Sequence, residues 1–262
     1  MELTVDNRTA YAATGNREID PSLPTVVFVH GAGQDHTIWV LPTRYFVRHG
    51  RNVLAINLPG HGRSEGPPLT SIEAMADWII GVLDAAGIEQ SAVVGHSMGS
   101  LIALETALRH PNRVRAIALV GTSVPMPVSD ELLESARQDD HAAVEMLTLW
   151  GHSRAAQIGG NATPGMWMIG GGQRLLERAA PGAIYADLKA CNEYVNGVEN
   201  AKQLACPALL ILGGRDSMTP TRSAMAVAKA IPDAETVILE RAGHALLSER
   251  PDPVLDELIK VV

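Results

Sequence analysis

Cysteine and aromatic residues are both scarce in this chain of 262 residues. It contains two cysteines, and aromatic residues make up 4% of the sequence. Two cysteines at this length argue against a disulfide framework and indicate free thiols in a reducing compartment. Neither Cys191 nor Cys206 lies in a turn typical of a catalytic nucleophile. Because hydrophobic residues still account for 46% of the chain, we expect a globular protein with a buried core.

Lysine and arginine are also outnumbered by acidic residues. The chain has 29 acidic and 21 basic residues, which give a formal net charge of −8 at pH 7, and its lysines and arginines form no basic tract. Proteins that bind nucleic acid carry a basic face that neutralises phosphates. We therefore expect no nucleic-acid partner.

Long apolar runs are missing as well. No run approaches the roughly 20 residues that a membrane-spanning helix needs. The first residues lack the basic region and apolar core of a signal peptide. The expectation is a cytoplasmic protein that does not associate with membranes. The sequence leaves open whether it is a monomer or a homodimer.

Short apolar runs alternate with helix-like segments along the chain. This alternation is typical of an α/β fold with a mostly parallel sheet and helices on both faces. Helical spacing occurs over residues 72–86, 101–109 and 253–259. Together the runs predict eight strands, at residues 3–5, 9–12, 26–29, 53–56, 92–94, 116–120, 208–212 and 236–239.

One interval between predicted strands is unusually long. Residues 121–207 exceed a normal strand-to-strand crossover and contain several helix-like stretches, at 130–137, 142–149, 172–179 and 183–194. We predict a core domain formed by residues 1–120 and 208–262, with residues 121–207 inserted as a helical cap, or lid, over the edge of the sheet. Segments at such edges usually shape access to a site. The alternative is an insertion that only stabilises the scaffold.

The most informative motif is Gly95-His96-Ser97-Met98-Gly99. It has the pattern Gly-x-Ser-x-Gly, and it lies directly between a predicted strand and a predicted helix. A serine in this context occupies a sharp, strained turn that presents its hydroxyl at the carboxyl edge of the sheet. The sequence therefore predicts that Ser97 is a nucleophile.

A serine hydroxyl needs a base to accept its proton, and the base needs an acid to orient it. His244 follows the last predicted strand, and Asp216 follows the strand before it. The order Ser97, Asp216, His244 is the order expected for a serine hydrolase on this kind of sheet. The strand that ends at Val120 leads into a stretch without a carboxylate, so Asp216 has little competition as the acid.

An oxyanion hole requires two amide donors aimed at the tetrahedral intermediate. The N–H of Met98 lies just after the nucleophile, at the start of a predicted helix whose dipole favours negative charge. The second donor should come from the loop after the first apolar strand, and Ala32 in His30-Gly31-Ala32-Gly33 is the simplest choice.

The sequence as a whole resembles the α/β-hydrolase fold superfamily over nearly its full length. The elements that carry the resemblance occur in the expected order: residues 30–33 with Trp39, residues 58–64, residues 95–99, residues 213–216 and residues 243–244. The resemblance implies a cofactor-free serine hydrolase with Ser97, Asp216 and His244 as its triad. It is specific for the fold and much less so for the substrate. The histidines show no metal-ligand spacing with carboxylates, so we expect no metal site.

Methionine and tryptophan side chains adapt to flexible apolar ligands. We therefore predict a substrate pocket lined by Trp39, Met126, Trp150, Met166 and Trp167. Core packing is the alternative role for most of these side chains.

The reaction predicted from these observations is hydrolysis of a small to medium apolar carboxylic ester through an acyl-enzyme. Lactone hydrolysis, carbon–carbon bond hydrolysis of ring-fission products, and cofactor-free perhydrolysis or acyl transfer could use the same triad. Serine at position 97 argues against the haloalkane and epoxide hydrolases, which carry aspartate there, and His96 disfavours the carbon–carbon hydrolases. A non-catalytic ligand receptor is the rival from another class.

Overall fold

The computed structural model describes residues 1–160 and 165–262, and a single sheet runs through this part of the chain. Its strands are β1 (Glu2–Val5), β2 (Arg8–Ala13), β3 (Thr25–Val29), β4 (Asn52–Ile56), β5 (Ser91–His96), β6 (Val114–Val120), β7 (Ala208–Gly213) and β8 (Glu235–Leu239). They form an eight-stranded sheet in the order β1-β2-β4-β3-β5-β6-β7-β8. Strands β3 to β8 are parallel, while β1 and β2 form an antiparallel hairpin that pairs with β4. The predicted α/β sheet is therefore confirmed.

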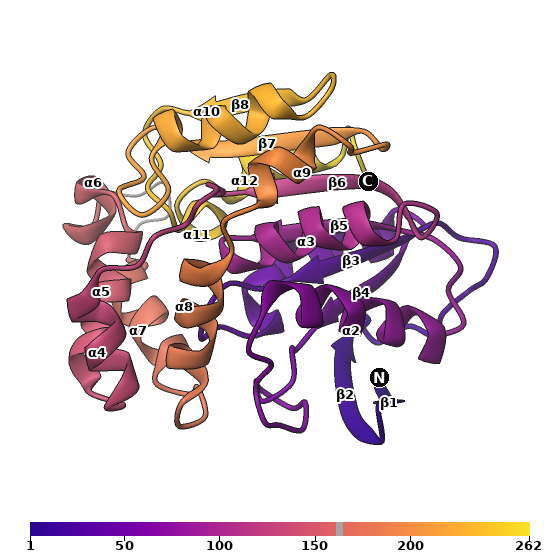
Figure 1. Ribbon diagram of the computed structural model, residues 1–262, viewed down its shortest axis with the longest axis horizontal. Helices are drawn as coiled ribbons and strands as arrows, with labels where there is room; N and C mark the ends of the chain where they lie inside the picture. The colour runs from indigo at the N-terminus through magenta and orange to yellow at the C-terminus, as the bar shows by residue number, and fades with distance from the viewer. Residues whose placement is uncertain (161–164) are drawn as a thin grey trace.

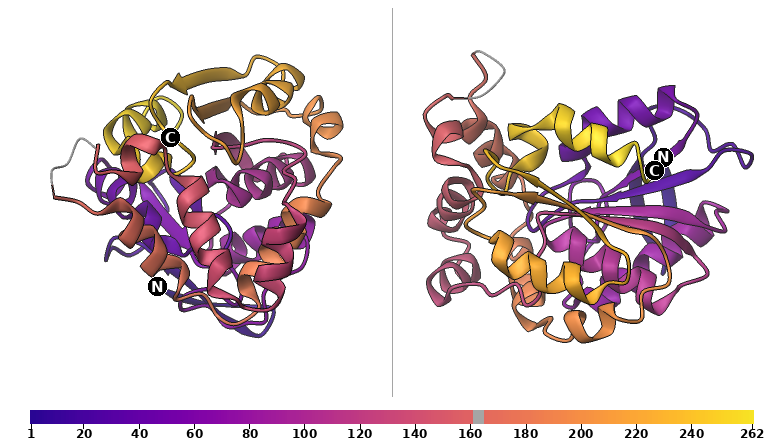
Figure 2. Two further views of the ribbon diagram at one scale, coloured as in Figure 1. Left: turned by 90° about the vertical axis from the view of Figure 1, so that its left-hand side faces the viewer. Right: turned by 90° about the horizontal axis from the view of Figure 1, so that it is seen from above.

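Helices cover both faces of the sheet because alternate strand residues point to opposite sides. In β3, Val27 and Val29 pack under α2 (Ile72–Ala85) and α3 (Met98–Arg109), and α10 (Thr221–Ala230) covers the same face. Val26 and Phe28 face the other side. That side is covered by η1 (His36–Trp39), α1 (Val40–Arg48), α11 (Leu246–Glu249) and α12 (Pro251–Leu258). The two helical layers are seen from above in the right panel of Figure 2.

Six helices lie between β6 and β7 in the described residues of this interval: α4 (Asp130–Arg137), α5 (His141–Gly151), α6 (Arg154–Gln157), α7 (Met168–Leu176), α8 (Ala183–Glu193) and α9 (Gly197–Ala201). Side-chain oxygens of Ser129 and Asp140 accept backbone N–H bonds at the starts of α4 and α5. Leu132, Leu147 and Leu188 contribute to a small apolar cluster shared by these helices.

Figure 1 shows α4, α5, α7 and α8 gathered at one end of the sheet, on the side where β6 and β7 meet the helical segment. Helices α8 and α9 also contact α3. The segment from β6 to β7 thus has apolar contacts of its own and is docked on the core. Residues 161–164 of the interval predicted as a cap lie outside the described residues.

The connection from β5 to α3 brings backbone segments unusually close together. A Cβ atom at Gly99 would overlap the carbonyl oxygens of Val29 and His30, and one at Gly95 would overlap the carbonyl of Gly99. Glycine at these two positions lets α3 pack directly on the ends of β3 and β5. The start of α3 is therefore held close to the loop that follows β3.

This close approach predicts a large effect of a single methyl group. We expect Gly99→Ala to lower the free energy of unfolding by about 3 kcal/mol, because backbone atoms must move to admit the Cβ. Gly171→Ala is the matched control, since its Cβ would meet nothing within 4 Å and alanine favours helix. Urea denaturation of both variants measures the difference, and equal stabilities would contradict the expectation.

Candidate active site

Ser97 lies in the sharp turn between β5 and α3. Its backbone has φ +55° and ψ −122°, a conformation that residues with a side chain rarely adopt. Two hydrogen bonds hold it there: the Ser97 N–H donates to the Val120 carbonyl at 2.9 Å, and the Ser100 N–H donates to the Ser97 carbonyl at 2.8 Å. The turn is thus strained and firmly anchored, as the motif predicted.

Asp216 and His244 come from the loops after β7 and β8 and form a buried pair. The Nδ1 atom of His244 lies 2.8 Å from Oδ2 of Asp216. Thr219 donates its hydroxyl to the same oxygen at 2.6 Å, and the N–H groups of Met218 and Thr219 donate to the other oxygen. Burial opposes ionisation of Asp216, but the His244 charge and these hydrogen bonds outweigh it and hold the pKa of the carboxyl well below its usual range.

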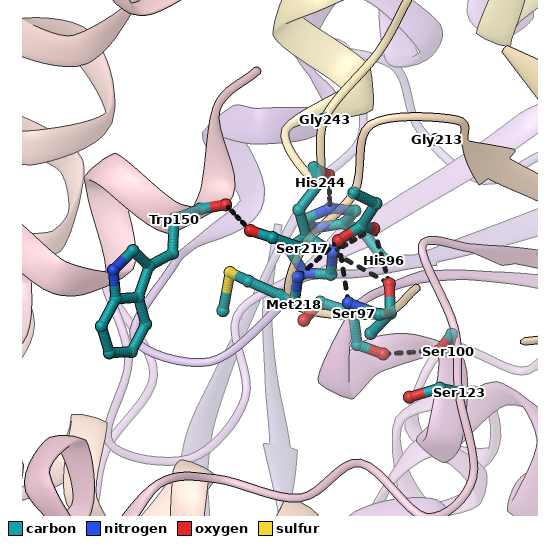
Figure 3. A network of polar contacts seen from close by, with 12 residues as sticks. His96, Ser97, Ser100, Ser123, Trp150, Gly213, Ser217, Met218, Gly243 and His244 are labelled. Carbon is teal, nitrogen blue, oxygen red and sulfur yellow. Dashed lines mark hydrogen bonds and ion pairs between the residues drawn. The ribbon is translucent and has the colours of Figure 1, made fainter. Parts of the chain in front are cut away.

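This pairing leaves the second imidazole nitrogen of His244 turned away from the acid. Nε2 is buried and has no hydrogen-bond partner among residues 1–160 and 165–262. Ser97 and His244 line the same cavity, and Figure 3 shows them together with His96. The structure therefore brings together the three residues predicted as the triad at one edge of the sheet.

The loop after β3 lies against the nucleophile turn. A Cβ atom at Gly31 would stand 3.0 Å from Cβ of Ser97, so a side chain at position 31 would crowd the nucleophile turn. Ala32 lines the same cavity as Ser97. The backbone N–H groups of Ala32 and Met98 have no hydrogen-bond partner within the described ranges. Both amides predicted as oxyanion donors are thus uncommitted within those ranges.

His96 connects the nucleophile turn to the loop that carries His244. Its Nε2 atom donates to the His244 carbonyl at 2.9 Å. Burial, together with the nearby His244 charge, lowers the pKa of His96 to about 3, so its ring is neutral. His96 therefore serves as a hydrogen-bond donor to the loop and not as a second base.

The end of α5 and the turn after it also contact the acid and base loops. The Ser217 hydroxyl donates to the Trp150 carbonyl at 3.0 Å, and the Ala245 N–H donates to the Gly151 carbonyl at 2.7 Å. The buried Glu249 carboxylate accepts N–H bonds from Ser153 on one side and from Gly243 on the other. Glu249 was missed by sequence reasoning, because no spacing rule connects it to Ser153.

A second buried carboxylate, Asp187 on α8, contacts the opposite side of the site. Its Oδ2 atom lies 2.9 Å from Nε2 of His61 and accepts the N–H of Gly33 at 2.8 Å. Burial disfavours the charged His61 ring, but the charge of Asp187 and the hydrogen bond to it outweigh that effect and raise the pKa of His61. The pair is a buried salt bridge between α8 and the loop after β4.

Two adjoining cavities lie beside the nucleophile turn, and Ser97 lines the inner one. The inner one has a volume of about 460 Å³, and both Met126 and Trp150 line it, although the Trp150 ring points away from Ser97 in Figure 3. The outer one has a volume of about 810 Å³ and is lined by Met166 and Trp167. Gln34, His96, His152, Gly172 and Ala245 line both.

The prediction that Trp39 lines the pocket is wrong. Its side chain is completely buried and stacks on Phe28, with ring centroids 4.8 Å apart. The short helix η1 turns Trp39 under the sheet, where an aromatic pair buries more apolar surface than a cavity wall would.

A family model described as "Alpha/beta hydrolase family" matches residues 26–257 of the chain. The chain belongs to the alpha/beta hydrolase family. It is 32% identical over 251 residues to pimeloyl-[acyl-carrier protein] methyl ester esterase of Chromobacterium violaceum, which covers 87% of this chain and 91% of that protein. It is 28% identical over 239 residues to the putative carbamate hydrolase RutD of Klebsiella pneumoniae, with 86% of each chain covered.

Solved structures agree with this assignment at the level of the fold. The enol-lactonase from Burkholderia xenovorans LB400 superimposes with a TM-score of 0.86 at 21% identity, covering 99% of this chain and 98% of that one. The curated relatives are named as esterases and hydrolases, which is consistent with a hydrolase of esterase type. Within residues 1–160 and 165–262, the helices are too short or too polar to cross a membrane.

The His61–Asp187 pair predicts a pH-dependent part of the stability. Because the pKa of His61 is raised in the folded state, its contribution is fully present below the ordinary value of 6.5 and is lost as pH rises through the folded-state pKa. We expect the difference in unfolding free energy between wild type and His61→Gln to shrink from about pH 6 to about pH 9. Urea denaturation across this range measures it, and a constant difference would contradict the assignment.

Proposed function

We propose that the protein is a serine hydrolase that cleaves carboxylic esters of small to medium apolar substrates. The observation that carries the proposal is the strained Ser97 turn, which shares a cavity with the buried His244–Asp216 pair. A nucleophile, a base and an acid in this relation are the requirements for acyl transfer through a covalent intermediate.

In this mechanism the Ser97 hydroxyl attacks the ester carbonyl, and Nε2 of His244 accepts its proton. Asp216 accepts a hydrogen bond from the Nδ1–H group of His244 and stabilises the imidazolium that forms. The carbonyl oxygen becomes an oxyanion, and the N–H groups of Ala32 and Met98 donate to it. His244 then protonates the departing alcohol. A water molecule, deprotonated by His244, then attacks the acyl carbonyl. As the bond to the Ser97 oxygen breaks, His244 returns the proton to that oxygen and the acid is released.

Residues 121–207 act in this proposal as a cap that shapes the substrate site. Met126, Leu132 and Leu188, all from this segment, line the inner cavity and make it apolar. A cavity of about 460 Å³ suits a small to medium acyl group. A longer arm of the substrate extends past His96 into the outer cavity, where Trp167 is 70% exposed.

Replacing the nucleophile tests the proposal directly. We expect Ser97→Ala to lower kcat for a p-nitrophenyl ester by at least about a thousandfold, because only binding and the oxyanion hole remain. Ser91→Ala is the matched control at the start of β5, the strand that leads to Ser97, since the buried Ser91 hydroxyl has no partner within the described ranges. Steady-state turnover of both variants decides the question. Stoichiometric retention of a ligand without turnover in the wild type would favour a receptor instead.

The two cavities predict different effects on chain-length preference. Met126→Ala enlarges the inner cavity, and we expect kcat/KM to rise for bulkier acyl groups relative to acetate. Trp167→Ala removes a wall of the outer cavity, and we expect KM to rise for esters with a long arm while acetate esters are unaffected.

Turnover of p-nitrophenyl and alkyl esters of graded length by both variants separates these effects. The assignment of the cavities is wrong if neither profile differs from that of the wild type.

A further inference from the structure

Asp187 is a buried carboxylate that the proposed mechanism does not use. It lies on α8, between β6 and β7, and its side chain is completely buried. Its Oδ2 atom accepts the Gly33 N–H at 2.8 Å, across 154 residues of sequence. Gly33 directly follows Ala32, whose amide is a proposed oxyanion donor. The contact therefore joins helix α8 to the loop that forms the oxyanion hole.

The cost of burying this carboxylate is offset by a matching charge. His61 lies 2.9 Å from the same Oδ2 atom, and its other nitrogen donates to the Pro59 carbonyl at 3.0 Å. A histidine that donates from both nitrogens carries a positive charge. Buried ion pairs contribute little net stability compared with apolar packing. The place of the His61–Asp187 pair beside the oxyanion loop points to a role in addition to its pH-dependent contribution to stability.

The Gly33 N–H belongs to the peptide group that leaves Ala32. Fixing this peptide group restricts rotation of the Ala32 backbone. It thereby restricts the direction in which the Ala32 N–H points. Helix α8 also packs tightly here, because a Cβ at Gly33 would stand 2.8 Å from Cγ1 of Ile184. On the other side of Ala32, the Gly31 N–H donates to the Gln34 side chain at 3.1 Å. The residues on both sides of Ala32 are thus held by hydrogen bonds.

We propose that Asp187 is a positioning residue for the oxyanion hole, with His61 as its counter-ion. The helical segment between β6 and β7 then aims the Ala32 amide at the developing oxyanion, in addition to enclosing the substrate. The inference rests on the proposed ester hydrolysis, since it assigns a role relative to the intermediate of that reaction.

The test compares Asp187→Ala and Asp187→Asn with Tyr194→Phe. Tyr194 directly follows α8, and its hydroxyl donates to the buried Glu105 carboxylate at 2.7 Å, so Tyr194→Phe removes a different polar contact between this helix and the core. Two quantities are measured for each variant. The first is kcat and KM for a short aryl ester. The second is the affinity for an aryl trifluoromethyl ketone, whose adduct with Ser97 places a negative oxygen in the hole.

We expect Asp187→Ala to lower kcat about 10- to 100-fold, with a much smaller change in KM, because a misaimed donor affects the transition state more than the bound ester. Affinity for the ketone should fall by a similar factor. Asp187→Asn keeps an acceptor for the Gly33 N–H, so it should lose activity and ketone affinity about 3- to 10-fold, less than alanine does. Tyr194→Phe should leave both quantities near their wild-type values.

The inference is overturned if Asp187→Ala and Tyr194→Phe lower kcat equally, or if ketone affinity is unchanged while kcat falls. Should Asp187→Ala fail to fold, Asp187→Asn decides by the same two measurements, and wild-type values for it overturn the inference. Failure of the proposed function looks different, because it would appear as ester turnover that is absent in the wild type or that survives Ser97→Ala. Turnover that depends on Ser97 but not on Asp187 refutes only the positioning role.

Discussion

The positive φ angle of Ser97 is the constraint on which the rest of the site depends. A side chain at φ +55° is unfavourable, and the conformation persists because the hydrogen bond to the Val120 carbonyl and the close packing at Gly95 and Gly99 leave the chain no alternative. The same packing sets the distance between α3 and the loop after β3. The nucleophile turn and the loop that carries Ala32 are therefore held close together by the same backbone packing.

Three buried carboxylates hold the loops around this turn, each in a different way. Asp216 accepts N–H bonds from its own loop and faces His244. Glu249 accepts from Gly243, next to His244, and from a residue just after α5. Asp187 accepts from Gly33 and is paired with a charged histidine. A buried carboxylate is costly to leave without partners, so these hydrogen bonds favour one position of each loop, although Oδ1 of Asp187 has no partner within the described residues.

Much of the fold followed from local pattern. Buried parallel strands are nearly continuous apolar runs, so β3 to β7 were recognisable from the sequence, and the predicted helix at 130–137 coincides with α4. Helices α1 and α10 were missed. Helix α1 contains Pro42 in its first turn, where proline is tolerated, and its place is decided by Phe46 packing near Phe28. The prediction that Trp39 lines the pocket was wrong because its sequence position, close to the loop after β3, does not determine the direction in which η1 turns the side chain.

The sequence by itself determined which loops meet, because parallel strands share one carboxyl edge and the residues that follow them must gather there. That reasoning was enough to select Ser97, Asp216 and His244 and the Ala32 loop. Only the tertiary structure decided what holds these groups in place. Asp187 reaches Gly33 across 154 residues and His61 across 126, and Glu249 reaches Ser153 across 96. Contacts this distant leave no periodicity in the chain, since they arise from how the helices between β6 and β7 dock on the sheet.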